Sequence, residues 1–333
     1  MLTHFAVLGS GAWGTAVAMV LAQNPEHHVT LWSARSEQAA SWHARRENVR
    51  LLPGVTIPHS IRLTADVNEA VERADLLIAA IPTVHLRATC ARIAPVVPKG
   101  VPLLSLVKGL ENHTFRRPTE IAREVLGERS VAVLSGPSHA EEVARGLPTT
   151  LVAASDDLQL AQWVQQRFST DRFRVYTNLD LTGVELAAAL KNVIGIAAGI
   201  NDGLGFGDNS KSALLTRGLA EMARFGVALG ANSSTFWGLA GMGDLITTCI
   251  SKHGRNRAVG ERLAKGEKLA DIQAGTSMVA EGVFTARSVY EKSVQMGIAM
   301  PITTEVYRVL YEGKDPRLAV SNLMLRELRS EHW

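Results

Sequence analysis

The stretch that most constrains the fold is residues 5–14, where a short apolar run meets three glycines at G-x-G-x-x-G spacing. The apolar run predicts a buried strand, and residues 15–22 continue at helical period with small side chains. A strand that turns directly into a helix presents free backbone N–H groups and the positive helix end at one point, which suits a pyrophosphate. Gly9 would permit the turn, Gly11 would let a phosphate approach, and Gly14 would let helix and strand pack closely. We therefore predict a dinucleotide site; the alternative is a tight turn that needs glycine only for steric reasons.

The residues after the second predicted strand, over 28–32, bear on the choice of cofactor. In units that prefer NAD, an Asp or Glu about twenty residues after the glycines accepts hydrogen bonds from the ribose hydroxyls. Here residues 33–36 read Ser-Ala-Arg-Ser, and no carboxylate follows until Glu37. An arginine flanked by small hydroxyl side chains suits a 2′-phosphate instead. We expect NADPH to be preferred over NADH, with Arg35 binding the 2′-phosphate. The alternative is an Arg35 that points into solvent.

Apolar runs alternate with helical patterns through the first half of the chain. Residues 74–82 form a near-continuous apolar run closed by proline, which is typical of a strand buried on both faces of a parallel sheet. The alternation predicts a doubly wound α/β fold, with residues 51–58 as an irregular connection. Strand signals stop at Leu181, and helical periodicity follows. We expect a Rossmann-like dinucleotide-binding domain over 1–180 and an all-α substrate-binding and catalytic domain over 181–333.

Composition and cysteine use narrow the class of protein. The net charge is +3, and the 35 Lys and Arg residues are dispersed, which argues against a nucleic-acid partner but allows local phosphate sites. Cys90 and Cys249 lie far apart without metal-ligand spacing, so we expect reduced thiols and no metal. The N-terminus lacks a signal-peptide pattern, and the apolar stretches read as too short and glycine-broken to span a bilayer. We expect a cytoplasmic protein without a membrane span.

Several polar residues stand where packing does not explain them. Lys108 follows a strand predicted over 101–107, at the edge of the sheet where ligands bind in open α/β folds. Lys191 and Asn192 interrupt a helix that is apolar on nearly all faces, and an unpaired ammonium in such a core is costly or gives up its proton. Asp244 is a single carboxylate in an apolar, glycine-lined segment. These residues are candidates for chemistry.

Reduction of a carbonyl by hydride needs an acid for the oxygen, and the reverse reaction needs a base, so a lysine with a lowered pKa fits both. A substrate phosphate needs a guanidinium and amide donors, which Arg255 and Asn256 offer. A purely structural role stays open as the alternative for each residue. Lys191 could form a structural ion pair with Asp244, Asp244 could cap a helix, and Arg255 and Lys108 could be solvated.

With these residues in place, the chain resembles, over essentially its whole length, the bacterial-type NAD(P)-dependent glycerol-3-phosphate dehydrogenases. Six segments carry the resemblance in the family's order and spacing: residues 9–16, 107–111, 135–138, 190–193, 239–245 and 254–257. The order and spacing of six segments are far more specific than the glycine motif alone.

The resemblance implies that Lys191 donates and accepts the proton, with Asp244 beside it and Asn192 and Lys108 orienting the substrate. It also implies a set of further substrate-binding residues: Gly136, Ser138, Gly254, Arg255 and Asn256. It implies cofactor contacts that join those of Gly9, Gly11, Gly14 and Arg35, made by Ala12, Trp13, Lys108, Ala140, Arg255, Val279 and Glu281. For Glu281, an ordinary surface carboxylate is the open alternative.

Two positions depart from the family pattern. Relatives often carry a serine at the position of Gly254, so one phosphate hydrogen bond is expected from the backbone here. A basic residue is common at the position of Ala34, and here it is displaced to Arg35.

The function implied is the reversible reduction of dihydroxyacetone phosphate to sn-glycerol 3-phosphate, which supplies the backbone of phospholipids. Apolar helix faces lead us to expect a homodimer. One alternative is a dehydrogenase of the same two-domain plan that acts on a carboxylate substrate. The other is a non-catalytic module that binds NADPH and reports redox state.

Overall fold

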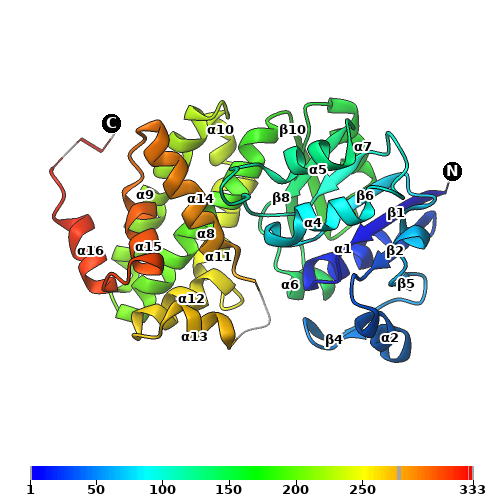
Figure 1. Ribbon diagram of the computed structural model, residues 1–333, viewed down its shortest axis with the longest axis horizontal. Helices are drawn as coiled ribbons and strands as arrows, with labels where there is room; N and C mark the ends of the chain where they lie inside the picture. The colour runs from blue at the N-terminus through cyan, green and yellow to red at the C-terminus, as the bar shows by residue number, and fades with distance from the viewer. Residues whose placement is uncertain (1, 276–278, 329, 332–333) are drawn as a thin grey trace.

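The computed structural model describes residues 2–275, 279–328 and 330–331. It has two parts, a sheet flanked by helices in the N-terminal half and a bundle of helices in the C-terminal half (Figure 1). The predicted fold class, a Rossmann-like sheet followed by an all-α domain, is confirmed.

An eight-stranded sheet with the order β10-β9-β8-β7-β6-β1-β2-β5 forms the centre of the first part. Its strands are β1 (Thr3–Leu8), β2 (His27–Trp32), β5 (Arg62–Thr64), β6 (Leu76–Ala79), β7 (Leu103–Ser105), β8 (Val131–Ser135), β9 (Thr149–Ala154) and β10 (Phe173–Asn178). Neighbours are parallel except β8 and β9, which are antiparallel. The chain between these two strands holds only the short helix α6 and does not cross back over the sheet, so one edge of the sheet runs in reverse.

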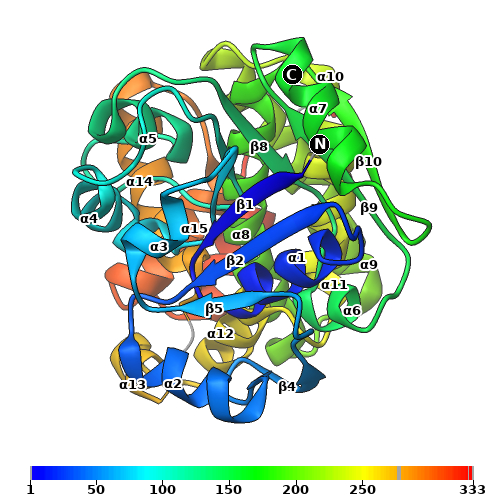
Figure 2. The same cartoon turned by 90° about the vertical axis from the view of Figure 1, so that its right-hand side faces the viewer.

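Helices cover both faces of the sheet (Figure 2). On one face lie α1 (Ala12–Leu21), α6 (Ala140–Ala144) and α7 (Leu158–Phe168), and on the other lie α3 (Val67–Val71), α4 (Thr83–Ile93) and α5 (Pro118–Leu126). The central strand β1 shows why: Phe5 and Val7 belong to the core on the α1 side, and Ala6 and Leu8 to the core on the α4 side. Because side chains alternate along a strand, a strand buried on both faces is apolar throughout.

The segment predicted to be an irregular connection forms a small hairpin instead. Strands β3 (Glu47–Asn48) and β4 (Leu52–Thr56) pair antiparallel after helix α2 (Ser36–Arg45). Leu52 and Val55 are buried and anchor the hairpin. The prediction is wrong because Pro53 and Gly54 look like strand breakers, although an exposed edge strand tolerates both.

Helix α8 (Leu181–Leu204) is the core of the second part. The carboxylate of Asp180 caps it by accepting from Gly183 N at 2.8 Å, and Gly205 ends it in the left-handed region with φ of 72°. The expectation that no apolar stretch could span a bilayer is wrong for α8, since its 24 residues meet that test by length and composition. The helix is this apolar because it is packed inside the protein, where 94% of its 18-residue apolar window is buried.

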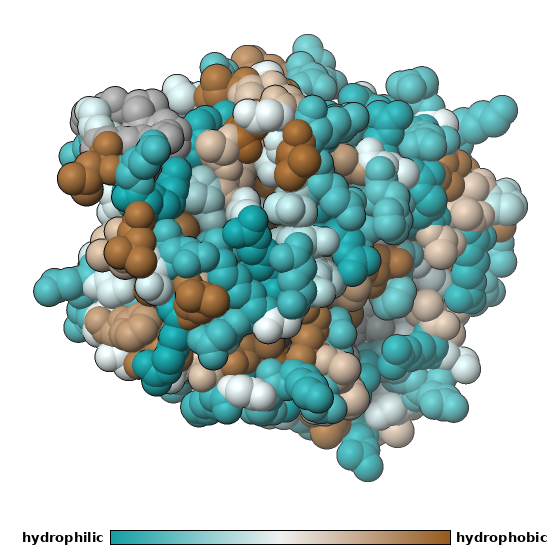
Figure 3. Space-filling model, turned by 60° about the vertical axis from the view of Figure 1, so that its left-hand side comes forward, coloured by the Kyte–Doolittle hydropathy of each residue, from teal (hydrophilic) through white to brown (hydrophobic). Residues whose placement is uncertain are grey.

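The remaining helices are α9 (Gly207–Ala228), α10 (Ser233–Phe236), the π-helix η1 (Leu239–Gly243), α11 (Asp244–Ile250), α12 (Arg255–Ala264), α13 (Leu269–Ala274), α14 (Glu281–Met296), α15 (Pro301–Tyr311) and α16 (Pro316–Met324). Most of them contact α8, whereas α13 packs on α12 and α16 on α15. The face of the molecule drawn in Figure 3 is mostly hydrophilic, with apolar side chains scattered over it.

Candidate active site

The glycine turn between β1 and α1 has the geometry that a dinucleotide needs. A Cβ on Gly9 would lie 2.4 Å from Ala80 O, and one on Gly14 would lie 2.2 Å from Gly9 O, so both positions exclude any side chain. A Cβ on Gly11 would meet no atom within 4 Å. Gly11 therefore leaves open space in front of the N-terminus of α1, where a bound pyrophosphate would lie. Ala12 and Trp13 form the first turn of that helix.

A polar network that the sequence did not reveal holds this turn. The carbonyl oxygen of Ser10 accepts from Gln38 Nε2 at 3.1 Å and from Asn48 Nδ2 at 3.0 Å. Ser33 Oγ donates to Ser10 Oγ at 3.1 Å and so connects the end of β2 to the turn. Arg35, at the N-cap of α2, is exposed, and within the described residues no hydrogen bond of its guanidinium is found.

Lys191, Lys108 and Asp244 meet in one cluster although they are far apart in sequence. Lys191 Nζ, from the middle of α8, donates to Asp244 Oδ1 at 3.1 Å and to Thr248 Oγ1 at 2.5 Å. Lys108 Nζ, from the loop after β7, donates to Asp244 Oδ2 at 2.7 Å. One buried carboxylate therefore holds two ammonium groups from the two halves of the chain. Asp244 does not cap its helix, which rules out that alternative.

Burial and charge act on these groups in opposite directions. Burial lowers the pKa of Lys191 to about 8, although the carboxylate of Asp244 favours the charged form. For Asp244, burial disfavours the carboxylate, but Lys108 and Lys191 outweigh it and hold its pKa below the usual range. The cluster therefore contains a permanent anion and an amine that exchanges its proton near neutral pH.

Thr248 is a member of the cluster that the sequence analysis missed. It follows Asp244 by four residues on α11, so both side chains point from the same face of the helix toward Lys191. That spacing was a signal that could have found it. The five residues of η1 precede Asp244 and widen the helix there, as π-turns often do at functional sites.

Asparagine side chains connect Lys108 to the start of α12. Asn192 Nδ2 donates to Lys108 O at 2.9 Å, and Asn256 Nδ2 donates to Asn192 Oδ1 at 2.8 Å. Asn256 Oδ1 in turn accepts from Gly282 N at 2.9 Å. Asn256 is therefore fixed between two elements of the protein, and one of its Nδ2 hydrogens has no acceptor in the part of the chain that the structure describes.

The loop after β8 supplies the second side of the cluster. Lys108 Nζ also donates to Gly136 O at 2.9 Å and to Ser138 Oγ at 3.2 Å. Gly136 has a φ of 135°, which disfavours any other residue. Ala140 opens the short helix α6 and is buried.

Arg255 and Gly254 form the N-terminus of α12. The guanidinium of Arg255 is exposed and donates to Val279 O at 3.1 Å. Gly254 is the N-cap, and no side chain of the described residues caps this helix, so the first backbone N–H groups are left for a ligand. A Cβ on Gly254 would lie 2.8 Å from Thr248 O, so a serine at this position would require the backbone to move.

Glu281 is not a surface carboxylate, so that alternative is wrong. Its Oε1 accepts from Thr83 N at 2.8 Å, at the start of α4. Its Oε2 and Thr83 Oγ1 are both buried, and neither has a hydrogen-bond partner among the residues that the structure describes. Both lie over Gly109, where an added Cβ would be 2.6 Å and 2.3 Å from them. Burial raises the pKa of Glu281, opposed by Thr83. Two orphaned oxygens at the carboxyl ends of β6 and β7 indicate a place for a polar ligand group.

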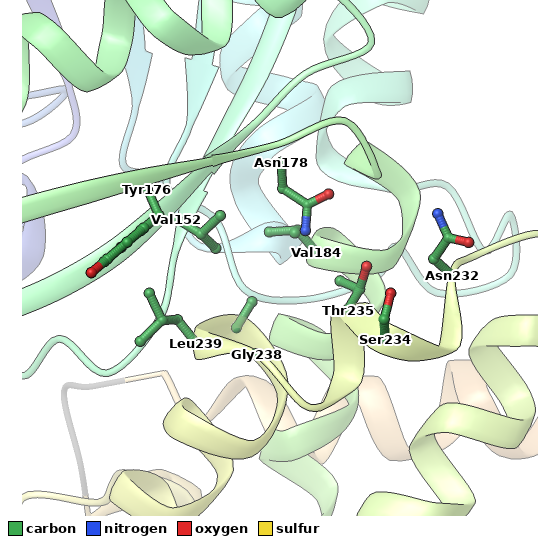
Figure 4. Close-up of a pocket in the computed structure, with 10 residues that line it drawn as sticks. Val152, Tyr176, Asn178, Val184, Asn232, Ser234, Thr235, Gly238 and Leu239 are labelled. Carbon is green, nitrogen blue, oxygen red and sulfur yellow. The ribbon is translucent and has the colours of Figure 1, made fainter.

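A separate pocket of about 250 Å³ lies between β10 and the α10–η1 segment, lined by residues that include Tyr176, Asn178, Thr235 and Leu239 (Figure 4). Its lining contains none of the predicted site residues. In the part of the chain that the structure describes, no group of three or more His, Cys, Asp or Glu side chains could hold a metal ion.

Comparison with known proteins identifies the family of the chain. Residues 4–161 match the N-terminal family of NAD-dependent glycerol-3-phosphate dehydrogenases, and residues 180–321 match the C-terminal family. A glycerol-3-phosphate dehydrogenase [NAD(P)+] of Chlorobium limicola is 48% identical over 331 residues, covering 98% of this chain and 99% of the relative. One of Geobacillus kaustophilus is 47% identical over 333 residues, covering 99% and 96%.

The fold agrees as well. The crystal structure of glycerol-3-phosphate dehydrogenase from Coxiella burnetii superposes with a TM-score of 0.94 at 36% identity, over 98% of this chain and 99% of that one. The family resemblance inferred from the six segments is confirmed. The chain therefore belongs to the NAD-dependent glycerol-3-phosphate dehydrogenase family.

Proposed function

We propose that the chain reduces dihydroxyacetone phosphate to sn-glycerol 3-phosphate reversibly, with Lys191 as the proton donor and acceptor. Its family makes it an NAD(P)-dependent oxidoreductase. The observation that carries the residue assignment is the buried Lys191–Asp244–Lys108 cluster, which lies beside the uncapped start of α12. Solvation or an ordinary helix cap explains none of the three charges.

The residues present fit a nicotinamide dinucleotide. The open space at Gly11 fits the pyrophosphate, and the orphaned Glu281 Oε2 and Thr83 Oγ1 suit a polar group on the nicotinamide. Residues assigned to hold the cofactor are Gly9, Gly11, Ala12, Trp13, Gly14, Arg35, Lys108, Ala140, Arg255, Val279 and Glu281. The reduced nicotinamide supplies the hydride that goes to the carbonyl carbon of the substrate.

The proton comes from Lys191. With a pKa of about 8, this amine is mostly protonated at neutral pH and can give its proton to the oxygen that becomes the alcohol. Asp244 stays ionised and stabilises the ammonium form, and Thr248 fixes the direction of Nζ. In the reverse reaction the neutral amine takes the proton from the alcohol, so reduction weakens and oxidation strengthens as the pH rises through about 8.

The phosphate of the substrate is assigned to the start of α12. The donors are the backbone N–H groups from Arg255 onward, the remaining side-chain N–H of Asn256 and the guanidinium of Arg255. The positive end of the helix dipole adds to the attraction for the phosphate. Lys108, held by Ser138 and Gly136, is assigned to the hydroxyketone end. A carboxylate substrate would leave the donors of α12 unpaired.

The test is the oxidation of NADPH by dihydroxyacetone phosphate, with NADH in parallel. Lys191→Ala should lower kcat by at least about 100-fold, as loss of a general acid does, while the dissociation constant of NADPH measured by fluorescence stays unchanged. Lys314→Ala is the matched control, because Lys314 is also a mostly buried lysine, paired with Glu305. Near-wild-type activity of Lys191→Ala, or equal rates with unphosphorylated and carboxylate ketones, would refute the assignment.

The proposal extends to the domain boundary, the oligomeric state and the location of the enzyme. We place the domain boundary at residues 180 and 181, between the end of β10 and the start of α8. We further propose a cytoplasmic homodimer whose product enters phospholipid synthesis. Sedimentation at micromolar protein tests the dimer, and a monomer there would end that part of the proposal.

A further inference from the structure

Two histidines that have no role in the proposed reaction lie beside the cluster. His139 is the N-cap residue of α6 and follows Ser138, to which Lys108 donates. His253 precedes Gly254 at the start of α12. The two rings are in contact, with centroids 5.7 Å apart and planes tilted by 55°. They join the substrate loop of the first half of the chain to the helix start assigned to the phosphate.

The His139 ring has an unused hydrogen-bonding atom. Its Nε2 is buried and has no partner among the described residues. A buried imidazole nitrogen without a partner is costly, because it has lost water and gained nothing in return. Nor does either ring form an ion pair within the part of the chain that the structure describes. The packing of the ring on His253 explains its position but not its free nitrogen.

The charges around His139 come from three elements. Lys191 on α8 disfavours its protonation, whereas Glu141 and Glu142 on α6 and Asp244 on α11 favour it. Burial is the largest effect, and together they lower the pKa of His139. The ring is therefore neutral at neutral pH, and a neutral ring can carry its hydrogen on Nε2 as a donor.

We propose that His139 is a further substrate-binding residue, whose Nε2–H donates to the phosphate group of the substrate while His253 holds the ring in place. This inference rests on the proposed function, since it needs a phosphorylated substrate. We place the donor at the phosphate end because the His139 ring packs on His253, the residue before the N-cap of α12. The ketone end is already surrounded by Lys191, Lys108 and Asp244.

Three substitutions at one position test the donor atom. In His139→Gln the side-chain nitrogen reaches the place of Nε2, in His139→Asn it reaches only the place of Nδ1, and His139→Phe keeps the ring without a donor. Loss of a hydrogen bond to a charged group should raise KM for dihydroxyacetone phosphate about tenfold in the Phe and Asn variants. His139→Gln should stay within about threefold of wild type, with kcat and the NADPH dissociation constant unchanged in all three.

Two further measurements separate the phosphate from other roles. With unphosphorylated dihydroxyacetone, kcat/KM should be the same in all variants and wild type. Binding of inorganic phosphate, followed by phosphorus NMR without turnover, should weaken in the Phe and Asn variants only. The proposal would be overturned if kcat/KM fell equally with both ketones, or if His139→Gln bound the substrate as weakly as His139→Asn. It would also be overturned if all three variants behaved like the wild type.

Failure of the proposed function has a different signature. A wild-type protein that does not reduce dihydroxyacetone phosphate refutes that function, whereas the phosphate titration still decides the role of His139. Should His139→Phe fail to fold, the comparison of Gln with Asn answers the same question.

Discussion

Replacement of Asp244 by Asn tests the electrostatics of the site most directly. Asp244 Oδ1 lies 3.1 Å from Lys191 Nζ, and both groups are buried. At an effective dielectric constant of about 20, two unit charges at about 3 Å attract by roughly 5 kcal/mol, which corresponds to about 4 in pKa. An amide oxygen remains in the variant, so we take about half of that value. The pKa of Lys191, about 8 in the wild type, should then fall to roughly 6.

The assay is kcat for reduction of dihydroxyacetone phosphate by NADPH between pH 5 and 9. An amine with a pKa of about 8 is roughly 90% protonated at pH 7, and one with a pKa of about 6 only roughly 10%. At pH 7 the variant should therefore be about tenfold slower and recover as the pH is lowered. Asp202→Asn, which removes a carboxylate paired with Lys211 and Arg257, is the control and should keep the wild-type midpoint.

A midpoint that stays near the wild-type value would refute this reasoning. An equal loss of kcat at every pH would do the same, because it would mean that Asp244 positions the substrate rather than the proton. Thermal melting of both variants confirms that they are folded.

Three other perturbations address the neighbouring parts of the site. Arg35→Ala should reduce the preference for NADPH over NADH in KM; an unchanged ratio would mean that the exposed Arg35 does not bind the 2′-phosphate. Gly14→Ala should destabilise the fold by about 1–3 kcal/mol in urea, whereas Gly11→Ala should leave stability unchanged and weaken NADPH binding; the reverse pattern would contradict the geometry. Thr248→Val should move the pH midpoint of reduction below that of wild type, since the ammonium of Lys191 loses an acceptor; an unmoved midpoint argues against that contact.

Local patterns predicted the frame of the molecule well. The glycine turn, the apolar run that becomes β6 and the apolar pattern of α8 were each visible in a few consecutive residues, because sterics and burial act locally there. Lys191 and Asp244 drew attention for the same reason, as charges in apolar surroundings. The reversed pair β8 and β9 was invisible, because strand direction depends on where the chain returns and not on its composition.

Parts of the site depend on contacts between distant residues, and these escaped prediction. The sequence left Glu281 open between a cofactor contact implied by the resemblance and a surface carboxylate, because its partner Thr83 lies almost two hundred residues earlier. The amides of Gln38 and Asn48 that hold Ser10 have no sequence signature either. A hydrogen bond across such a separation is decided by the tertiary fold, which a single sequence does not display.

The way the two lysines share Asp244 ties chemistry to folding. Lys108 belongs to the first half of the chain and Lys191 to the second, and burial of either ammonium is more costly without that carboxylate. In a partly folded chain, the two ammonium groups would therefore stay in water or lose their protons. The reactive amine acquires its character only when both halves have docked, so a chain that folds incompletely gains no misplaced acid.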